Sequence, residues 1–256
     1  MKGRRLTRRK KKGPARGSRR RGGEAPPGNS INTLMKAVEE GNISTVNSLL
    51  KAPQKPDVNV IGPDGATALM IAAYFGDKDI VEKLLEAGAQ VNILSKGGDS
   101  ALIFAAKAGH ESIVEMLLEK NADVNAVVAD GRTALLDAAE GGHTSIVKML
   151  LEKGADVNAV DADGRTALLD AASAGKEETV DVLLTKKPNI NATDATGDTA
   201  LISALSGDYI SIAKKLLAAG AKHTHKVKEL IKESQTRMLQ RGGRKKYTRK
   251  HKKHHK

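Results

Sequence analysis

The chain has 256 residues, a net charge of +13, no cysteine or tryptophan, three tyrosines and two phenylalanines. The lack of cysteine excludes disulfides and thiolate chemistry, and the few aromatic residues leave the core to Ala, Val, Ile and Leu, which suits closely packed short helices. The charge is uneven: residues 1–29 hold 12 Lys and Arg against one Glu, residues 222–256 hold 14 against two, and residues 30–221 hold 17 against 27 Asp and Glu. An acidic middle region of net charge −10 therefore lies between two basic ends.

Residues 1–29 form the first segment. Leu6 is its only large aliphatic residue, so the segment lacks the apolar stretch of a secretory signal. A segment with so much like charge cannot bury enough surface to offset the entropy of ordering, and we expect a disordered basic tail. No run in the chain reaches the roughly 18–20 apolar residues of a membrane span, so no membrane partner is expected.

Residues 30–221 contain an internal repeat with a period of 33. The sequence DGRTALLDAA occurs at 130–139 and again at 163–172, and an Ala-Leu pair begins at residues 68, 101, 134, 167 and 200. An earlier copy, Leu34-Met35, precedes Leu69-Met70 by 35 residues. Self-similarity at such a period is the signature of stacked repeats. We predict six repeats, at about 30–62, 63–95, 96–128, 129–161, 162–194 and 195–221.

The fourth repeat shows how each copy is expected to fold. Asp130-Gly131 is a turn signal, and Thr133 is a good N-cap for a helix that begins at Ala134. Gly142 ends this helix in the left-handed conformation. A second helix with one apolar stripe follows, and a lone repeat could bury both helices only by stacking on its neighbours. The stripe consists of Ile146, Val147, Leu150 and Leu151, and Gly154 terminates the helix.

These residues resemble the ankyrin repeat over residues 30–221. The recurring pattern is Gly-x-Thr-x-Leu-x-x-Ala-Ala-x-x-Gly-x-x-x-Ile-Val-x-x-Leu-Leu-x-x-Gly-Ala-Asp-Val-Asn. The resemblance implies an all-α solenoid of stacked helix–loop–helix repeats, with the turns on one side and a concave face formed by the first helices. It also implies a non-catalytic scaffold that binds another protein and needs no cofactor.

Three departures from the family pattern carry expectations. An apolar residue replaces the family's His after the Ala-Leu pair, which we interpret as an exchange of polarity for packing. Lys187-Pro188 stands where Gly-Ala is expected and predicts a distorted helix end between the fifth and sixth repeats. Gly207 comes one residue early and Asp208 takes the usual Gly place, which predicts an irregular sixth repeat. The apolar replacements are Met70, Ile103, Leu136, Leu169 and Ile202.

Residues 222–241 follow the last repeat and include HKVKELIKESQTRMLQ at 225–240. Apolar residues recur on one side at helical spacing. A solenoid needs an end that is polar outside and apolar inside, so we interpret this segment as a capping helix; the alternative is a free helix that binds a partner. The stripe consists of Val227, Leu230, Ile231, Ser234 and Met238. Residues 242–256 are expected to be a second disordered basic tail.

The two basic tails are candidate sites for nuclear or nucleolar targeting, or for non-specific contact with nucleic acid. Tyr247 is the only aromatic residue among them, so contact with nucleic acid should be sequence-independent and salt-sensitive. The alternatives are a solubilising tail in the cytoplasm and attraction to an anionic membrane surface, for which no lipidation motif is present. The Gly-Gly pair before a basic C-terminus also looks like tails found in some large DNA viruses. The candidate residues are Arg4, Arg5, Arg8, Arg9, Lys10, Lys11, Lys12, Arg19, Arg20, Arg21, Arg244, Lys245, Lys246, Arg249, Lys250, Lys252 and Lys253.

Neither metal binding nor catalysis is expected. The candidate metal ligands lie among many lysines, whose charge repels cations, and without carboxylate or thiolate help. Asp137 and Asp170 could form a carboxylate pair, because stacked helices lie about 8–10 Å apart. A repeat stack offers no deep pocket to desolvate either acid, so their pKa values should not be moved apart as acid–base catalysis requires. The histidines concerned are His223, His225, His251, His254 and His255.

Recognition of another protein is the expected use of the surface. In the family, the residue before the Ala-Ala pair and two after it face the concave side. The first repeats offer an apolar hot spot there, and the fourth and fifth offer an acidic strip. We therefore expect a partner with an apolar anchor and basic flanks, bound by a monomer. The concave candidates are Ile71, Tyr74, Phe75, Phe104, Lys107, Asp137, Glu140, Asp170, Ser173 and Ser203, and the turn-tip candidates are Asp64, Asp99, Asp130, Arg132, Asp163, Arg165 and Asp198.

Alternatives remain for these residues. The acids can be a solvated face and the aromatic residues can fill a gap between repeats, or a basic tail can lie in the chain's own groove. The repeat frame accounts for the turn, the cap and the alanines of DGRTALLDAA but leaves Asp137 and Asp170 unexplained by stability. The loop asparagines are expected to hydrogen-bond to loop backbone. They are Asn92, Asn125, Asn158 and Asn191.

Overall fold

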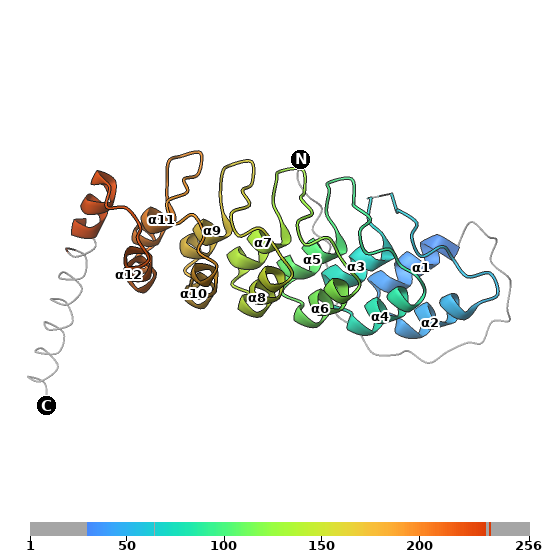
Figure 1. Ribbon diagram of the computed structural model, residues 1–256. Helices are drawn as coiled ribbons and strands as arrows, with labels where there is room; N and C mark the ends of the chain where they lie inside the picture. Colours follow the sequence, from blue (N-terminus) through green and yellow to red (C-terminus); the bar gives the residue numbers. More distant parts are fainter. Residues whose placement is uncertain (1–29, 64, 234–235, 237–256) are drawn as a thin grey trace, which may run out of the picture. The chain divides into compact units, whose positions relative to one another are not determined.

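The computed structural model describes residues 30–63, 65–233 and 236, and this part of the chain is all-α (Figure 1). It divides between Ala126 and Val127 into two compact units, the N-terminal unit (residues 30–126) and the C-terminal unit (residues 127–233). Extended pairing in the described residues is confined to isolated bridges, Val127 with Thr133 and Val160 with Thr166. The expected basic tails at 1–29 and 242–256, and the turn residue Asp64, lie outside the described residues.

The N-terminal unit contains three helix pairs in two rows (Figure 1). The first helices α1, α3 and α5 pack on one another, the second helices α2, α4 and α6 form the other row, and each first helix packs on its own second helix. Each of the first three predicted repeats therefore contains one helix pair. The bounds are α1 Ser30–Glu39, α2 Ile43–Lys51, α3 Ala68–Phe75, α4 Lys78–Glu86, α5 Ala101–Ala108 and α6 Glu111–Glu119.

The C-terminal unit repeats the arrangement. Helix α9 packs between α7 and α11, and α10 packs between α8 and α12. The loops that precede α9 and α11 project from the same side of this unit (Figure 1). The bounds are α7 Ala134–Gly141, α8 Thr144–Glu152, α9 Ala167–Ser173, α10 Glu177–Thr185, α11 Ala200–Ser206 and α12 Ile210–Ala218. In the described part of the chain, no helix is long and apolar enough to span a lipid bilayer.

Hydroxyl caps start the first helices. Thr133 has an extended backbone, and its hydroxyl accepts a hydrogen bond from the backbone N–H of Leu136, so the helix begins at Ala134 as predicted. Such a cap contributes about 1 kcal/mol, which matters for helices of two turns. The same contact recurs at the other first helices from α3 onward. These caps are Thr67, Ser100, Thr166 and Thr199.

The core lies between the two rows of helices in each unit. The alanine pairs at the middle of α3, α5, α7 and α9 are fully buried, and their small side chains let neighbouring first helices approach closely. The apolar residues that replace the family's His are buried as well, which confirms that this position serves packing. They are Met70, Ile103, Leu136, Leu169 and Ile202.

The two expected irregularities were wrong. Helix α10 ends at Thr185, and Lys187 takes the left-handed conformation with φ 52°, at the place where Gly154 has φ 90° two residues after α8. Helix α11 ends at Ser206, and Asp208 has φ 59° at the place of Gly175. The backbone path is therefore retained, and the missing glycines appear as local strain instead of a distorted helix end.

A further helix follows the last repeat. Residues 225–233 are helical, and the side chain of Val227 is buried while Leu230 and Ile231 are half-buried. This helix therefore covers an apolar end of the C-terminal unit. The expected stripe residues Ser234 and Met238 lie outside the described residues.

Loop asparagines join successive repeats within each unit. The side chain of Asn92 accepts a hydrogen bond from the backbone N–H of Asp123 at 2.8 Å and donates one to the carbonyl of Asn121 at 3.2 Å. Asn158 accepts from the backbone N–H of Asn189 at 2.8 Å, and Asn191 from that of Lys222 at 2.9 Å. The expected backbone contact is confirmed at Asn92, Asn158 and Asn191, and the backbone concerned belongs to the next repeat.

Candidate functional site

The predicted concave residues occupy equivalent places on successive first helices. Positions 71, 104, 137 and 170 are 33 residues apart and lie on α3, α5, α7 and α9. The N-terminal unit places Ile71 and Phe104 there, whereas the C-terminal unit places Asp137 and Asp170. One position of the repeat thus carries apolar chemistry in one unit and acidic chemistry in the other.

In the N-terminal unit the three candidate aromatic side chains meet. The ring of Tyr74 lies 5.3 Å from that of Phe75 with an interplanar angle of 76°, and 5.9 Å from that of Phe104 with an angle of 85°. These are edge-to-face contacts, which add to the stability of an apolar cluster. All three side chains remain half-buried. We call Tyr74, Phe75 and Phe104 the aromatic cluster; Ile71 is buried, and Lys107 is exposed on α5.

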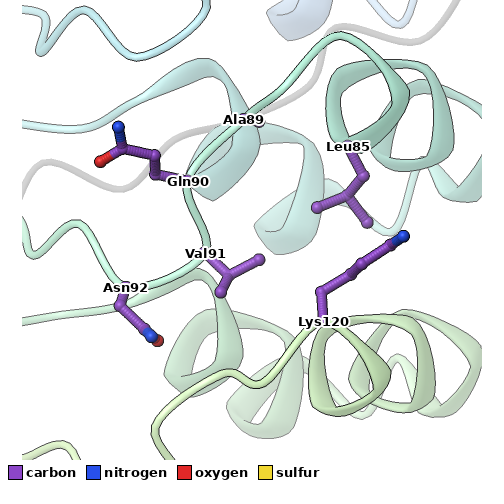
Figure 2. A pocket seen from close by; sticks show the side chains of 6 residues that line it. All are labelled: Leu85, Ala89, Gln90, Val91, Asn92 and Lys120. Atoms are coloured by element: carbon purple, nitrogen blue, oxygen red, sulfur yellow. The ribbon is translucent and has the colours of Figure 1, made fainter.

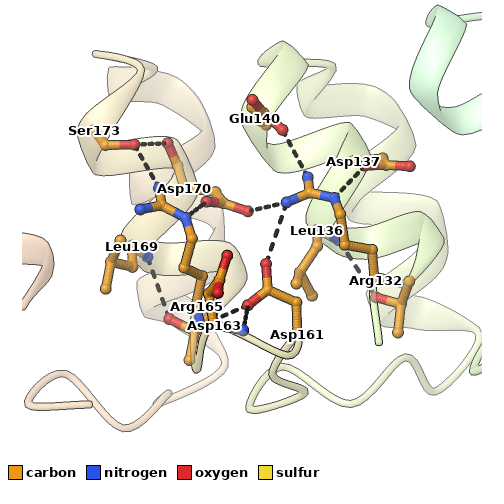
Figure 3. Close-up of polar contacts among 12 residues, drawn as sticks. Arg132, Leu136, Asp137, Glu140, Asp161, Asp163, Arg165, Leu169, Asp170 and Ser173 are labelled. Atoms are coloured by element: carbon orange, nitrogen blue, oxygen red, sulfur yellow. Dashed lines mark hydrogen bonds and ion pairs between the residues drawn. The ribbon is translucent and has the colours of Figure 1, made fainter. Parts of the chain in front are cut away.

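In the C-terminal unit Arg132 binds four carboxylates (Figure 3). Its Nε donates to Asp137 Oδ1 at 2.7 Å and its Nη2 to Glu140 Oε2 at 2.7 Å, both on the helix that follows its own turn. Its Nη1 reaches Asp161 Oδ2 at 3.4 Å, in the loop that leads to α9, and Asp170 Oδ2 at 3.3 Å, on α9 in the next repeat. The guanidinium therefore lies across the junction of the fourth and fifth repeats.

Arg165 repeats this arrangement one repeat later (Figure 3). Its Nε donates to Asp170 Oδ1 at 2.6 Å and its Nη2 to Ser173 Oγ at 3.0 Å. Its Nη1 lies 3.7 Å from Asp194 Oδ2 in the loop that leads to α11. Asp170 is thus shared by both arginines. We call Arg132, Arg165 and the carboxylates that contact them the arginine ladder.

Burial and charge oppose each other in the arginine ladder. Burial raises the pKa of Asp170 above its ordinary value, although hydrogen bonding from Arg165 and the charges of Arg165 and Arg132 lower it. Burial also disfavours the charged form of Arg132, but its hydrogen bond to Asp137 and the nearby charges of Asp137, Asp170 and Glu140 raise its pKa. Arg132 is therefore a permanent cation at the centre of the ladder.

The expected acidic strip was wrong for two of its three residues. The side chains of Asp137 and Asp170 are only 4% and 1% exposed and are engaged by arginines, while that of Glu140 is 61% exposed. The argument that stability leaves both aspartates unexplained was also wrong, because each pairs with the arginine five residues before it. The stack does desolvate both acids, contrary to expectation, but guanidinium groups fill the space beside them.

The turn-tip candidates differ in where their side chains point. Asp130 and Asp163 are exposed, and Asp130 Oδ1 accepts a hydrogen bond from the backbone N–H of Arg132 at 3.1 Å. Arg132 and Arg165 are turned inward onto the first helices, so the expectation that they are surface contacts was wrong. The remaining candidates in the described residues have local partners, since Asp99 accepts from Ser95 Oγ at 3.0 Å and Asp198 pairs with Lys226.

Two ladder residues were missed from the sequence, although a signal for them exists. Asp161 replaces Val128 between copies that are otherwise almost identical. Asp161 follows Arg132 by 29 residues, and Asp194 follows Arg165 by 29 residues. At the same spacing Val128 follows Asp99. An acid therefore occurs 29 residues after each arginine, and the atoms of these pairs lie 3.4 Å and 3.7 Å apart.

The hollows found in the N-terminal unit are shallow. One hollow of about 410 Å³ lies beside the end of α4 and is lined by Leu85, Lys120 and the loop residues 89–92 (Figure 2). A second, of about 500 Å³, lies at the start of α6, where His110 contacts the carbonyl oxygen of Tyr74 at 3.1 Å. The first lining combines aliphatic side chains, two amides and one ammonium group, which does not supply an acid–base pair. In the described residues, no group of three or more His, Cys, Asp or Glu side chains is placed to hold a metal ion.

Comparison with known proteins agrees with the geometry. A family model described as ankyrin repeats in three copies matches residues 34–128, 88–161 and 135–227. Oxysterol-binding protein-related protein 1 of Rattus norvegicus and that of Mus musculus are each 45% identical over 56 residues, which is 22% of this chain and 6% of those proteins. The chain thus spans only a small part of these relatives. Ankyrin repeats generally mediate binding to other proteins and are typically non-catalytic. Since the family matches extend over most of the sequence, the chain belongs to the ankyrin-repeat family.

Proposed function

We propose that the chain is a non-catalytic module that binds another protein, and that the aromatic cluster on α3 and α5 receives the partner's apolar anchor. The observation that carries this proposal is the edge-to-face contact of Tyr74 with Phe75 and Phe104 on a half-exposed surface. Aromatic side chains supply the largest contributions in protein interfaces. This chain has only two phenylalanines, and both lie in the cluster.

The proposed partner carries basic residues beside its apolar anchor. Support comes from the net charge of −10 over residues 30–221, which attracts cationic partners and raises their rate of association. Among the carboxylates of the arginine ladder, Glu140 is exposed and can contact a basic partner directly. We further propose that the chain acts as a monomer, because the partner then has access to the whole first-helix face.

The sequence itself supplies the test variants for the aromatic cluster. At the places of Tyr74 and Phe104 the later repeats carry Ser173 and Ser203, so Tyr74→Ser and Phe104→Ser copy residues that the repeat fold already accepts. Proteins captured from nuclease-treated extract by the full chain would be identified by mass spectrometry, purified and titrated against both variants. We expect each variant to weaken binding at least tenfold, since truncating an aromatic hot spot costs roughly 2 kcal/mol or more.

A tyrosine in the other unit provides the control. Tyr209 is exposed at the start of α12, and Tyr209→Ser removes an aromatic ring without touching the aromatic cluster. Circular dichroism melting would show that all three variants keep the fold. Unchanged capture of every purified partner by Tyr74→Ser and Phe104→Ser would overturn the proposed site, and absence of any captured protein would overturn the proposed function.

A second candidate function rests on the basic ends of the sequence. Residues 1–29 hold 12 Lys and Arg, a density that suits binding to RNA or DNA backbones. In this case the repeats are architectural, and nuclease treatment abolishes all capture. A fragment of residues 30–241 then captures nothing, and the affinity of the full chain for nucleic acid falls steeply with salt concentration.

We also propose that these ends direct the protein to the nucleus or nucleolus. Fusion of residues 1–29 or 242–256 to a fluorescent reporter would test this, because the same basic residues bind import receptors. Accumulation of both fusions in the cytoplasm would contradict the proposal. Replacement of the basic residues by Gln in a fusion that does accumulate in the nucleus provides the matched control.

A further inference from the structure

Exposed aliphatic side chains recur at one position of the repeat. Among the described residues five large hydrophobic side chains are exposed, and four of them lie 33 residues apart: Ile61 at 50%, Leu94 at 46%, Val127 at 53% and Val160 at 53%. The first two belong to the N-terminal unit and the other two to the C-terminal unit. In the fifth repeat the same position is Thr193, which is also exposed.

Folding does not account for these aliphatic residues. A side chain that remains half-exposed gains only part of the transfer free energy of burial. Extended backbone favours β-branched residues, and this explains valine as well as it explains threonine. Thr193 shows that a hydroxyl is accepted at this position, and Leu94 is not β-branched. An aliphatic side chain here is therefore available for contact with another molecule.

The loops that carry Val127 and Val160 are held rigidly. Each forms a hairpin loop, at 127–133 and 160–166, closed by an isolated bridge between its ends. The backbone N–H of Ala162 donates to the carbonyl of Asp130 at 2.7 Å, which ties the second hairpin to the first. Gly131 has φ 81°, and a side chain there would lie 3.2 Å from the backbone of the next hairpin. Because these loops need little ordering on binding, the surface is preorganised.

The exposed charges at the tips of the two hairpins are acidic because the arginines of the same hairpins are turned away. Arg132 and Arg165 direct their guanidinium groups onto Asp137 and Asp170 (Figure 3). Asp130 and Asp163 at the tips of the two hairpins remain exposed. In the N-terminal unit the surroundings differ, because Lys96 is exposed and its Nζ donates to the carbonyl of Pro63 at 3.0 Å, next to the loop of Ile61.

We propose that Val127 and Val160, with Asp130 and Asp163, form a second docking surface, which binds a protein segment that presents aliphatic side chains between Lys or Arg residues. We call these four residues the hairpin surface. The aliphatic side chains cover the valines, and the cationic side chains complement the aspartates. The proposal rests on the proposed function, because it names a further contact of the same protein-binding module.

Random peptides displayed on phage and panned against the full chain provide the first test, with heparin present to occupy the basic ends. We expect enriched sequences that combine aliphatic residues with Lys or Arg. Synthetic versions of the enriched peptides are then titrated against Val127→Thr/Val160→Thr, which copies the residue at 193. We expect affinity to fall about tenfold, which corresponds to about 1.4 kcal/mol.

Two further variants separate this surface from its alternatives. Ile61→Thr/Leu94→Thr makes the same chemical change in the N-terminal unit and should change affinity less than threefold. Asp130→Asn/Asp163→Asn removes charge while keeping a side-chain oxygen that can accept from the turn backbone, and it should weaken binding severalfold and reduce the dependence on salt. Equal losses in the two Thr variants would overturn the assignment to the C-terminal unit.

The remaining outcomes are also decisive. No enriched peptides, enriched peptides without basic residues, or equal affinity for Val127→Thr/Val160→Thr would each overturn the hairpin surface. Sedimentation that shows a dimer of the full chain, dissociated by Val127→Thr/Val160→Thr, would instead assign the surface to self-association. If proteins captured from extract bind normally to Val127→Thr/Val160→Thr but lose affinity for Tyr74→Ser, only this inference fails and the proposed function stands.

Discussion

The first helices of the two units differ in the side chains that occupy the position before the alanine pair. On α3 and α5 the position before the alanine pair holds Ile71 and Phe104, and the aromatic cluster extends beside it. On α7 and α9 the same position holds Asp137 and Asp170, buried beneath Arg132 and Arg165. The scaffold therefore accepts apolar or ionic groups at this place.

The difference matters because the two solutions respond differently to mutation. An apolar cluster loses stability in proportion to the area uncovered. A buried ion pair that loses one member leaves an uncompensated charge, which costs more than the pair contributes. The arginine ladder also shares its groups between repeats, since Asp170 accepts from both Arg165 and Arg132.

Removing the shared carboxylate should have the largest effect. We expect Asp170→Ala to lower the free energy of unfolding by about 3 kcal/mol, at the lower end of the range for broken buried pairs, because both arginines keep other partners. Urea unfolding followed by circular dichroism measures it. Asp163→Ala, an exposed acid of the same repeat, is the control and should change stability by less than about 0.5 kcal/mol. Equal effects of the two variants would show that the ladder does not stabilise the unit.

Replacing the ladder by the chemistry of the other unit should restore most of that loss. Arg132→Ala/Asp137→Ile copies Ala66 and Ile71, and Arg165→Ala/Asp170→Phe extends the apolar face to α9. We expect the fourfold variant to be about 2 kcal/mol more stable than Asp170→Ala, since well-packed apolar groups replace buried ion pairs at little cost. The same urea transition reports it. A fourfold variant no more stable than Asp170→Ala would mean that the two faces are not interchangeable.

The helix ends of both units share a feature with a smaller effect. Lys187 and Asp208 in the C-terminal unit adopt left-handed backbone with φ 52° and 59°, as Asn121 does in the N-terminal unit with φ 60°. We expect Lys187→Gly and Asp208→Gly each to raise the free energy of unfolding by about 0.5–1 kcal/mol, because glycine adopts this conformation without steric cost. Gly154→Ala, which imposes the same strain on the preceding repeat, should lower it by a similar amount. Thermal melting of the three variants, compared with the unmodified chain, measures both signs.

The smallest effect is a dependence on pH that runs opposite to ordinary acid denaturation. The pKa of Asp170 is raised in the folded state, chiefly by burial, so the folded protein takes up this proton more readily than the unfolded chain. The contribution is therefore fully present below the unfolded pKa of about 3.9 and is lost as pH rises through the folded value. Asp170→Asn lacks this contribution. We expect the stability difference between the unmodified chain and Asp170→Asn to shift in favour of the unmodified chain as pH falls from neutral, as measured by urea unfolding.

Most of the fold follows from local sequence signals. The period of 33, the hydroxyl before each Ala-Leu pair and the alanine pairs indicate helix starts and close packing without reference to distant residues. The apolar hot spot could be predicted as well, because the resemblance to the repeat family implies that Tyr74, Phe75 and Phe104 lie on the concave side of neighbouring first helices. Lys187 and Asp208 were misjudged, because a repeat that packs on both sides enforces its backbone path at the expense of local strain.

The environment of Asp137 and Asp170 could not be predicted in the same way. Arg132 belongs to a hairpin loop and Asp137 to a helix, so their contact depends on how the loop folds over the helix. The second contact of Arg132, with Asp170, further depends on the stacking of two repeats. Sequence spacing within one element predicts which side chains share a face, but it does not show whether an arginine of another element covers them.

The loop asparagines have a consequence for how the protein opens. The amides of Gln90, Asp123, Asn189 and Lys222 lie in exposed loops, yet each donates to an asparagine of the preceding repeat. Their exchange with solvent deuterium therefore requires two neighbouring repeats to separate, and it does not require either repeat to unfold. Each of these four backbone amides therefore reports the opening of one junction between repeats. Their exchange rates would give the order in which the junctions open.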